Sequence, residues 1–369
     1  GADAALSTIT ASSMTAATGD VTVDDFRTVN ALTVNAGGLA TVGGIGLATV
    51  GTIIGGAYIT AGATTLNALG EIGGVTVQAA GNATLTAGAD IVNSTVEGFK
   101  VVLDAAGNIS NTAAEAQTTA DLTAVNAISG SNVTAGADVT LTALQIGNTS
   151  AAALTGEITT DGNIFDSTLT AQGDVTITNA YYASNNMVVA GGKIDVTAVK
   201  TVGGSYLADG TIDVLADLIA SATFDSGDVV TMTATGNIEL VNVKANNGAK
   251  LTSGAAIDGS TVVVNSDDAK LTAVQIANSA ITTESGSVIF TADDLYNLTV
   301  TSAGVIDGTA VVGNLVGGSY VAAGDITFDA ASTIASASFD GSADVILTAS
   351  GNIELVGVKA NDNATLTST

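Results

Sequence analysis

The stretch DVILTASGNIELVGVKANDN, residues 344–363, contains the pattern that decides the fold. Apolar residues alternate with their neighbours through residues 345–348 and again through 353–356, with a Ser-Gly-Asn turn between the two runs. A shorter run at 358–360 ends in Asn-Asp-Asn. Period-two alternation with β-branched residues and Gly/Asn/Asp punctuation is typical of short strands rather than helices. The stretch therefore predicts one coil of three short strands.

The same phrase recurs along the chain at a nearly fixed interval. The apolar residue at the centre of each phrase follows the previous one by 18, 19 or 20 residues, except for double steps from 141 to 177 and from 290 to 328. These marker residues are Leu47, Leu66, Leu85, Leu103, Leu122, Leu141, Ile177, Val196, Val214, Met232, Leu251, Leu271, Phe290, Phe328, Leu347 and Leu366. A longer repeat overlies them, because GGSY at 203–206 returns at 317–320. Internal repeats of this kind indicate a solenoid.

Stacked coils also explain the composition. In a parallel β-solenoid each strand bonds to the coils above and below, about 4.8 Å away, and inward residues form columns. We expect columns that contain the pairs Val175/Ile177, Ile194/Val196, Ile212/Val214, Val230/Met232, Ile326/Phe328 and Val345/Leu347. Proline would remove a ladder donor, and the chain has none. The sequence therefore predicts an all-β fold: a right-handed parallel β-solenoid (β-helix) with about 19 residues and three short strands per coil.

Two parts of the chain differ in how well they fit this period. Residues 47–369 follow it as a continuous β-solenoid shaft, whereas residues 1–46 fit poorly and are predicted to form atypical first coils or a cap. The repeat stops in mid-phrase at Thr369, and an open coil exposes unpaired strand groups. We expect a truncated shaft or an end-stacked one, with end-to-end or lateral self-association.

The composition excludes several classes of chemistry. The chain has 369 residues with 35 acidic and 8 basic side chains, a formal net charge of −27, and no His or Cys. Without His and Cys, no Ser–His or Cys–His nucleophile pair and no thiolate zinc site can form. Phosphate binding needs clustered Lys and Arg, so nucleic acid is not an expected partner. A run of about 18 apolar residues is absent, so we expect no transmembrane segment.

The phrases DVTLTA at 138–143 and SGNI at 350–353, set in a nineteen-residue repeat, resemble the repeat region of filamentous-haemagglutinin-like exoproteins. The resemblance covers residues 47–369. It implies a right-handed β-helix in a large secreted bacterial protein used in adhesion, contact toxins or biofilm matrix. The family's amino-terminal secretion domain has Asn-Pro motifs, which this proline-free chain lacks. The resemblance implies an extracellular or cell-surface address.

Adjacent carboxylates occur twice, as Asp267-Asp268 and as Asp293-Asp294. β-Solenoids host polysaccharide lyases and hydrolases, and such enzymes use carboxylates as general acids and bases. Neighbours on a strand point to opposite faces, however, so neither pair forms a ready dyad. We interpret both pairs as solvated surface groups, and we do not expect an enzyme.

The notable aromatic residues are the pair Tyr181-Tyr182 and the equivalent residues Tyr206 and Tyr320 of the long repeat. Packing at a corner is the favoured interpretation, and contact with a glycan or a partner is the alternative. Thr-x-Thr pairs flank several markers, as at 84–86 and 140–142, and a flat rank of such pairs could bind ice. Lysine and aspartate in the same column, for example at 195, 213, 250 and 270, interrupt that rank.

A candidate cation site lies at the entry to the marker strands. Counting three residues before each marker places Asp325, Asp344 and Asn363 on successive coils. Two carboxylates about 5 Å apart repel one another unless they are screened, protonated or bridged. Either they hydrogen-bond the backbone, or Asp325 and Asp344 form a weak site for a hard cation such as Ca²⁺. We expect no other cofactor.

These observations predict a non-catalytic extracellular structural protein, either an adhesin shaft or the subunit of a surface filament or matrix fibre. The alternatives are a carbohydrate-active β-helix enzyme and a passive solenoid that binds glycan or ice. Expected partners are further copies of the chain and, in adhesion, glycans or the surface of a host or neighbouring cell.

Overall fold

The computed structural model describes residues 8–23, 26–42, 50–330 and 332–369. The regular structure of these residues is all β, and none of them belongs to a helix long and apolar enough to cross a membrane. Contacts divide the chain into two compact units, unit 1 (Gly1–Ala180) and unit 2 (Tyr181–Thr369). Parallel coils of about 19 residues form a β-solenoid, which confirms the predicted fold class.

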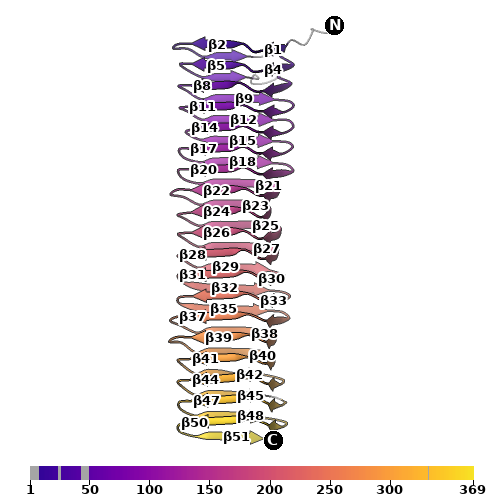
Figure 1. Ribbon diagram of the computed structural model, residues 1–369, viewed down its shortest axis with the longest axis vertical. Helices are drawn as coiled ribbons and strands as arrows, with labels where there is room; N and C mark the ends of the chain where they lie inside the picture. Colours follow the sequence, from indigo (N-terminus) through magenta and orange to yellow (C-terminus); the bar gives the residue numbers. More distant parts are fainter. Residues whose placement is uncertain (1–7, 24–25, 43–49, 331) are drawn as a thin grey trace. The chain divides into compact units, whose positions relative to one another are not determined.

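Each coil contributes strands to two sheets (Figure 1). Sheet A holds a first strand and a short second strand of each coil, and sheet B holds a third strand of four residues. In several coils the first and second strands join into one strand of eight to ten residues, as in β23 (Ile158–Phe165) and β25 (Val175–Ser184).

In unit 1, sheet A contains β1 (Thr8–Thr10), β3 (Val21–Val23), β4 (Thr28–Asn30), β6 (Ala40–Val42), β7 (Thr52–Ile54), β9 (Thr64–Ala68), β10 (Ile72–Gly73), β12 (Ala83–Ala87), β13 (Ile91–Val92), β15 (Val101–Ala105), β16 (Ile109–Ser110), β18 (Ala120–Ala124), β19 (Ala127–Ser129), β21 (Val139–Gly147) and β23. Sheet B of unit 1 contains β2 (Ser13–Ala16), β5 (Thr33–Ala36), β8 (Ala57–Thr60), β11 (Thr76–Ala79), β14 (Thr95–Gly98), β17 (Ala113–Ala116), β20 (Asn132–Ala135), β22 (Ser150–Ala153) and β24 (Thr168–Ala171).

In unit 2, sheet A contains β27 (Ile194–Val202), β29 (Ile212–Ala216), β30 (Leu218–Ala220), β32 (Val229–Ala234), β33 (Ile238–Glu239), β35 (Gly248–Ser253), β36 (Ala256–Asp258), β38 (Ala269–Ala277), β40 (Val288–Tyr296), β42 (Ile306–Val311), β43 (Leu315–Val316), β45 (Ile326–Ala330), β46 (Ile334–Ala335), β48 (Val345–Ala349), β49 (Ile353–Glu354) and β51 (Ala364–Ser368). Sheet B of unit 2 contains β26 (Met187–Ala190), β28 (Ser205–Ala208), β31 (Thr223–Ser226), β34 (Asn242–Ala245), β37 (Thr261–Val264), β39 (Ala280–Thr283), β41 (Thr299–Ser302), β44 (Ser319–Ala322), β47 (Ser338–Gly341) and β50 (Gly357–Ala360).

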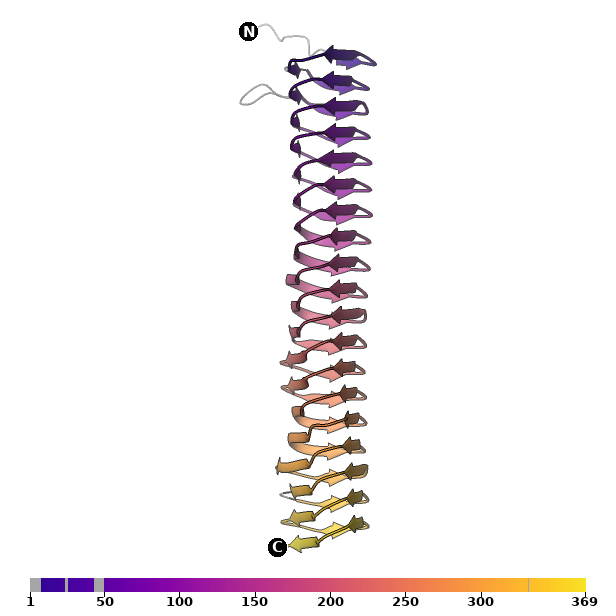
Figure 2. The ribbon, with the colours of Figure 1, turned by 90° about the vertical axis from the view of Figure 1, so that its left-hand side faces the viewer.

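Neighbouring coils pair in parallel, and equivalent residues face one another. In unit 1, Leu85 on β12 pairs with Leu66 on β9 and with Leu103 on β15. In unit 2, Leu251 on β35 pairs with Met232 and is followed by Leu271. Figure 2 shows this parallel repetition of strands from one coil to the next within each unit. The marker residues joined by such pairs therefore stack as predicted, and Leu47 lies outside the described residues.

The core consists of inward side chains from both sheets. Every predicted inward pair is buried, from Val175 and Ile177 to Val345 and Leu347. Burial alternates along the strands, as in β12, where Ala83, Leu85 and Ala87 are buried and the residues between them are half-buried. Full burial of a Val, Leu or Ile side chain contributes about 1.5–3 kcal/mol, so these columns hold the coils together.

The two double steps of the sequence pattern are complete coils in the structure. Thr160 on β23 pairs with Leu141 and is fully buried, so a threonine takes the marker place there. Gly308 on β42 takes it in the other coil and pairs with Phe328. A Cβ at Gly308 would lie 2.0 Å from the Phe328 ring, so the aromatic side chain fills the space that a marker side chain would need.

The corner between the second and third strands has one backbone conformation throughout. The residue there has a positive φ in each described coil: Ala11, Ala31, Gly55, Gly74, Asn93, Asn111, Gly130, Asn148, Asp166, Asn185, Gly203, Ser221, Leu240, Gly259, Asn278, Asn297, Gly317, Ser336 and Leu355. Gly, Asn and Asp adopt this left-handed conformation readily, but alanine and leucine do so at a cost. Stacking on neighbouring coils, rather than residue type alone, therefore fixes the corner.

The amino-terminal strands also stack as coils. β1 pairs with β4 and β4 pairs with β7, all in parallel. The corners at Ala11, Ala31 and Gly55 are 20 and 24 residues apart, wider than most later ones. Residues 1–7, 24–25 and 43–49 lie outside the described chain, so the assignment of 1–46 as atypical first coils or a cap stays a prediction.

Candidate functional site

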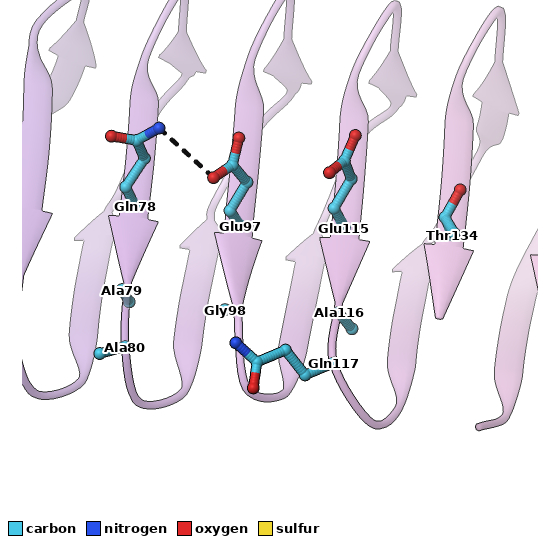
Figure 3. Close-up of a pocket in the computed structure, with 9 residues that line it drawn as sticks. All are labelled: Gln78, Ala79, Ala80, Glu97, Gly98, Glu115, Ala116, Gln117 and Thr134. Carbon is cyan, nitrogen blue, oxygen red and sulfur yellow. Dashed lines mark hydrogen bonds between the residues drawn. The ribbon is translucent and has the colours of Figure 1, made fainter. Parts of the chain in front are cut away.

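The outer face of sheet B in unit 1 carries a shallow hollow of about 400 Å³. Figure 3 shows its long polar side chains in a row on four neighbouring strands: Gln78 on β11, Glu97 on β14, Glu115 on β17 and Thr134 on β20. Small residues beside them, Ala79, Ala80, Gly98 and Ala116, leave the surface low between the longer side chains.

The chemistry of this hollow is limited. Gln78 Nε2 donates a hydrogen bond of 3.3 Å to Glu97 Oε2, and Glu97 is in register with Glu115. Carboxylates directly opposite one another on a sheet repel. Two carboxylates act as acid and base when their environments differ, but here both extend outward from the same column. The hollow is therefore a weak candidate for catalysis and an acidic patch on the sheet.

The adjacent carboxylates singled out in the sequence serve turns. Asp267 Oδ1 accepts a hydrogen bond from the Asp268 amide at 2.8 Å, and Asp268 Oδ1 accepts one from the Ser287 amide of the next coil at 3.0 Å. Asp294 Oδ1 accepts from both the amide and the side chain of Asn314 at 2.8 and 3.0 Å. The bonds of Asp268 and Asp294 join successive coils, and that of Asp267 is local to its turn, which fits the solvated, structural interpretation.

Asp325 and Asp344 lie on successive coils, as the spacing predicts, since β45 and β48 pair in register. Asp325 Oδ1 accepts from the Asp344 amide at 3.1 Å, and Asp344 Oδ1 accepts from the amide and side chain of Asn363 at 2.9 Å each. Among the residues the structure describes, no group of three or more acidic side chains is arranged to hold a metal ion. The backbone interpretation thus has direct support, and Ca²⁺ binding stays a prediction.

The same contact recurs at this turn in unit 1. Asp20 accepts from the Leu39 amide at 2.8 Å, and Asp138 accepts from the Glu157 amide at 3.0 Å. At the turn before the second strand, Asp90 makes a similar contact with the Asn108 amide at 2.7 Å. An aspartate here uses its carboxylate to bind the next coil. Part of the acidic composition is therefore structural.

Tyr206 and Tyr320 are core residues rather than corner residues. Both are fully buried on the inner side of sheet B, as is Tyr58, so a glycan cannot reach them. Tyr206 stacks on Phe224 with ring centroids 5.0 Å apart, and Tyr320 stacks on Phe339 at 5.1 Å. The interpretation that these tyrosines pack at a corner was wrong. Each is the second residue of a sheet B strand and points into the core.

A pair of glycines precedes each buried tyrosine. The second of the pair, Gly56, Gly204 or Gly318, has a φ between 92° and 105°. A Cβ at Gly318 would lie 2.5 Å from the Leu298 carbonyl oxygen and 3.2 Å from the Tyr320 ring. The Gly-Gly pair thus lets the backbone turn closely enough to accommodate the ring.

Burial also changes the acidity of these phenols. Burial raises the pKa of Tyr206 to about 12, and the Asn186 side chain lowers it in part. Burial raises the pKa of Tyr58 and of Tyr320 further above the ordinary value, and neither hydroxyl has a hydrogen-bond partner.

Tyr181 and Tyr182 are exposed, at 52% and 43%. Their rings meet edge to face with centroids 4.7 Å apart, and Lys200 Nζ lies 5.6 Å from the centre of the Tyr182 ring. An exposed aromatic pair beside a cation offers a platform for a sugar ring or a partner side chain.

The threonine ranks of sheet A are interrupted where the sequence indicated. Asp195 pairs with Asp213, and Lys250 pairs with Lys270, in the outward column that carries the threonines. An ice-binding plane of that column is therefore broken by charge in unit 2.

Sequence reasoning missed a second outward column, on sheet B of unit 2. Lys244 Nζ lies 3.2 Å from Asp225 Oδ2, and Lys359 Nζ lies 2.9 Å from Asp340 Oδ1. The two ion pairs occupy equivalent places in the long repeat. Reading the residue after each inward sheet B residue at nineteen-residue steps would have revealed this column.

Comparison with known proteins adds no family to this description. A scan against protein-family models and a search of curated proteins found no match, so the resemblance to filamentous-haemagglutinin-like repeats stays a prediction.

Proposed function

We propose that the chain is a non-catalytic structural protein displayed outside the cell, as an adhesin shaft or as the subunit of a surface filament or matrix fibre. The observation that carries the proposal is the uninterrupted pairing of coils within each unit. In unit 1, for example, β12 bonds to β9 on one side and to β15 on the other. Continuous ladders over a dry apolar core resist bending and local opening, which a shaft requires.

The placement of polar groups supports a structural role over catalysis. The carboxylates at the turns bind the next coil, and the buried tyrosines pack the core. The chain also contains no His or Cys that could act as a nucleophile or base. An extracellular address is supported by the repeat resemblance and by the absence of cysteine, which leaves an exported chain no disulfides to form.

Self-association, end to end or lateral, is part of the proposal. The coils of each unit add to one another edge to edge and in parallel, as β48 adds to β45. An exposed strand edge is a template for a further parallel strand. In the proposed filament, separate copies associate through such edges or through their outer faces.

Electron microscopy of intact cells tests this function. Antibodies against the chain, detected with gold on cells that have not been permeabilised, should label fibres or projections at the surface. Labelling that appears only after permeabilisation, within the cytoplasm, would contradict the proposal.

Glycan binding is a second candidate, favoured by the exposed Tyr181–Tyr182 pair beside Lys200. A glycan array probed with the parent chain and with Tyr181→Ala/Tyr182→Ala tests it. Binding that the double variant loses supports an adhesive surface, and equal signals from both chains remove it.

A further inference from the structure

The third residues of the sheet B strands form an outward column in unit 2. From β31 to β50 the column contains, each in register with the next, Asp225, Lys244, Val263, Thr282, Thr301, Val321, Asp340 and Lys359. Two acids and two bases cancel, so this column is neutral in a chain of net charge −27. Its side chains are exposed or half-buried.

The order of residues in this column is self-complementary. Read in the opposite direction, the column places Lys opposite Asp at both ends, Val opposite Val, and Thr opposite Thr. Asp225 then faces Lys359, Lys244 faces Asp340, Val263 faces Val321, and Thr282 faces Thr301. A surface that matches its own reverse is what a two-fold symmetric interface requires.

We propose that the outer face of β31–β50 binds the same face of a second copy, with the two solenoid axes antiparallel. The inference rests on the proposed structural function and specifies how its lateral contact is made. A two-fold axis that lies between the faces, along the strand direction, reverses the order of strands and keeps positions along each strand. The column therefore meets its own reverse.

The alternative two-fold arrangement lacks this match. With the solenoid axes parallel, the axis of symmetry reverses positions along each strand and keeps the strand order. If the axis lies over the second residues, the third-residue column faces the first-residue column of the partner, where Asp225 would meet Thr223. If the axis lies over the third residues, each residue faces its own copy, so that Asp225 would meet the partner's Asp225 and the like charges would repel. Only the antiparallel arrangement pairs all four charges.

The neighbouring column permits the approach. The first residues of the same strands are small and uncharged: Thr223, Asn242, Thr261, Ala280, Thr299, Ser319, Ser338 and Gly357. They bring no charge and no long side chain between two sheets, which pack about 10 Å apart.

The ends of the interface become closed rings of four charges. Asp225 already contacts Lys244 within the chain, at 3.2 Å, and the antiparallel copy adds the partner's Lys359 and the partner's Asp340. Signs alternate around this ring, and symmetry generates a second one. Exposed ion pairs stabilise contact little on their own, but a mismatch of like charges would oppose it, so the rings set orientation.

The area indicates a weak interface. Seven strand spacings of about 4.8 Å and a width of about 13 Å give roughly 440 Å² per copy. Stable complexes bury about 800 Å² per partner, so we expect a dimer that forms at high protein concentration or when many copies are held side by side.

A charge swap tests the proposal in solution. The acidic variant, Lys244→Asp/Lys359→Asp, and the basic variant, Asp225→Lys/Asp340→Lys, each place like charges opposite one another in the antiparallel pair. Sedimentation velocity up to about 1 mM protein at low salt should show each variant self-associating at least about tenfold more weakly than the parent. An equimolar mixture of the two variants should restore association to within about threefold of the parent.

The matched control is Lys250→Asp/Lys270→Asp, which makes the same change in charge on sheet A. It should self-associate as the parent does. Circular dichroism verifies that each variant retains its strands. A monomeric parent at about 1 mM, an unassociated mixture, or equal loss in the control would overturn the proposal.

A second readout does not depend on these charges. The chain has no cysteine, so Val263→Cys and Val321→Cys chains can be mixed and treated with a short bis-maleimide. These two positions lie three strand spacings apart, about 14 Å, on β37 and β44, so a short linker distinguishes 263–321 from 263–263 across the face. Heterodimers that link position 263 to position 321 should clearly exceed half of the linked product, the share that random pairing gives. A random share of heterodimers would contradict the antiparallel face. The proposed function is tested separately, by surface labelling of intact cells. That labelling can succeed even if the antiparallel contact fails, so the two failures are distinguishable.

Discussion

The sheet B strands β11–β20 of unit 1 and β31–β50 of unit 2 have the same length and the same alternation of burial, and they carry outer surfaces of different charge. In unit 1 the outward third residues run Gln78, Glu97, Glu115 and Thr134, an acidic row with a hollow beside it. In unit 2 they form the neutral, self-complementary column from Asp225 to Lys359. The same backbone therefore carries an acidic face in unit 1 and, in unit 2, a neutral face that the proposed antiparallel pairing uses.

The inner residues of the same strands differ as well. Strands β11–β20 use Val77, Val96, Ala114 and Val133. Strands β31–β50 include the stacked pair Tyr320–Phe339 and Phe224, which stacks on Tyr206 of the preceding β28. The coils pair with either aliphatic or aromatic inner residues, because the ladder hydrogen bonds are made by the backbone. Inner residues set stability and outer residues set contacts, and each can change without the other.

The largest expected effect comes from the inner column of unit 2. Phe339→Ala removes a fully buried ring that stacks on Tyr320 and should destabilise the fold by about 3–5 kcal/mol. Denaturant unfolding followed by circular dichroism measures the loss. Val133→Ala in unit 1 is the matched control and should cost less, because fewer buried atoms are removed. An equal cost in the two units would contradict the distinction between their cores.

A smaller effect is expected at the Gly-Gly turns. Gly318→Ala forces a side chain into a φ of 103° and against the Leu298 carbonyl, and it should cost about 1–3 kcal/mol. Gly357→Ala is the control, because its φ is not positive and its nearest atom to an added Cβ is 4.0 Å away. The control should leave the unfolding midpoint unchanged or raise it. A Gly318→Ala midpoint equal to that of the parent would show that the turn tolerates a side chain.

The next largest effect is expected at alkaline pH, which should distinguish the buried tyrosines from the exposed ones. The pKa of Tyr206 is about 12 in the folded protein and 10.0 for the free side chain, so the unfolded chain ionises first. Stability is then retained below pH 10 and falls as pH rises, by about 1.4 kcal/mol per pH unit for each buried tyrosine. Tyr206→Phe/Tyr320→Phe should make the unfolding midpoint less dependent on pH between pH 10 and 12. Tyr181→Phe, at an exposed position, should not.

The outer residues should change stability least among the substitutions. Glu97→Gln/Glu115→Gln removes a like-charge pair and should stabilise the chain by about 0.2–1 kcal/mol, less at high salt. Lys244→Gln in unit 2 removes an exposed ion pair and should have the opposite sign, with a cost of at most about 1 kcal/mol. Thermal midpoints at low and high salt measure both. The same sign for both variants would refute the contrast between the two faces.

Calcium tests the remaining acidic column. If Ca²⁺ bridges Asp325 and Asp344, an amount equal to its Kd stabilises the fold by about 0.4 kcal/mol. Thermal unfolding with millimolar Ca²⁺ against chelator should then show a rise that Asp344→Asn loses. If Ca²⁺ does not change the unfolding midpoint of the parent, the carboxylates bind no calcium, and their role is to accept hydrogen bonds from the next coil.

Much of the fold follows from the sequence because apolar inward residues repeat in nearly every coil. The alternation around Leu85 and Leu347 predicts both the strands and the buried side. The two coils without a marker could not be predicted. Thr160 is not apolar, and the space that a side chain at Gly308 would occupy is filled by Phe328 from the next coil. Such exchanges of volume between coils leave no periodic signal.

The corners and the outer face were harder to predict. Asn and Gly are expected at positive φ, but Leu240 and Leu355 adopt it too, because the neighbouring coils fix the backbone there. Tyr206 could be placed inward only once its strand was known, since a tyrosine is common at surfaces. The column from Asp225 to Lys359 has no hydrophobic pattern and becomes visible only when the register is known.

The register of the coils also determines how the chain folds. Each residue meets its ladder partners about one coil away in sequence, as Leu85 meets Leu66 and Leu103. Closing so short a loop costs little entropy, and each completed coil offers a finished edge on which the next can form. Folding can therefore start at any coil and advance one coil at a time. If folding pauses, the chain has a folded set of coils joined to an unfolded remainder. Folding then resumes by adding coils to the folded edge, without rearrangement of the coils already formed.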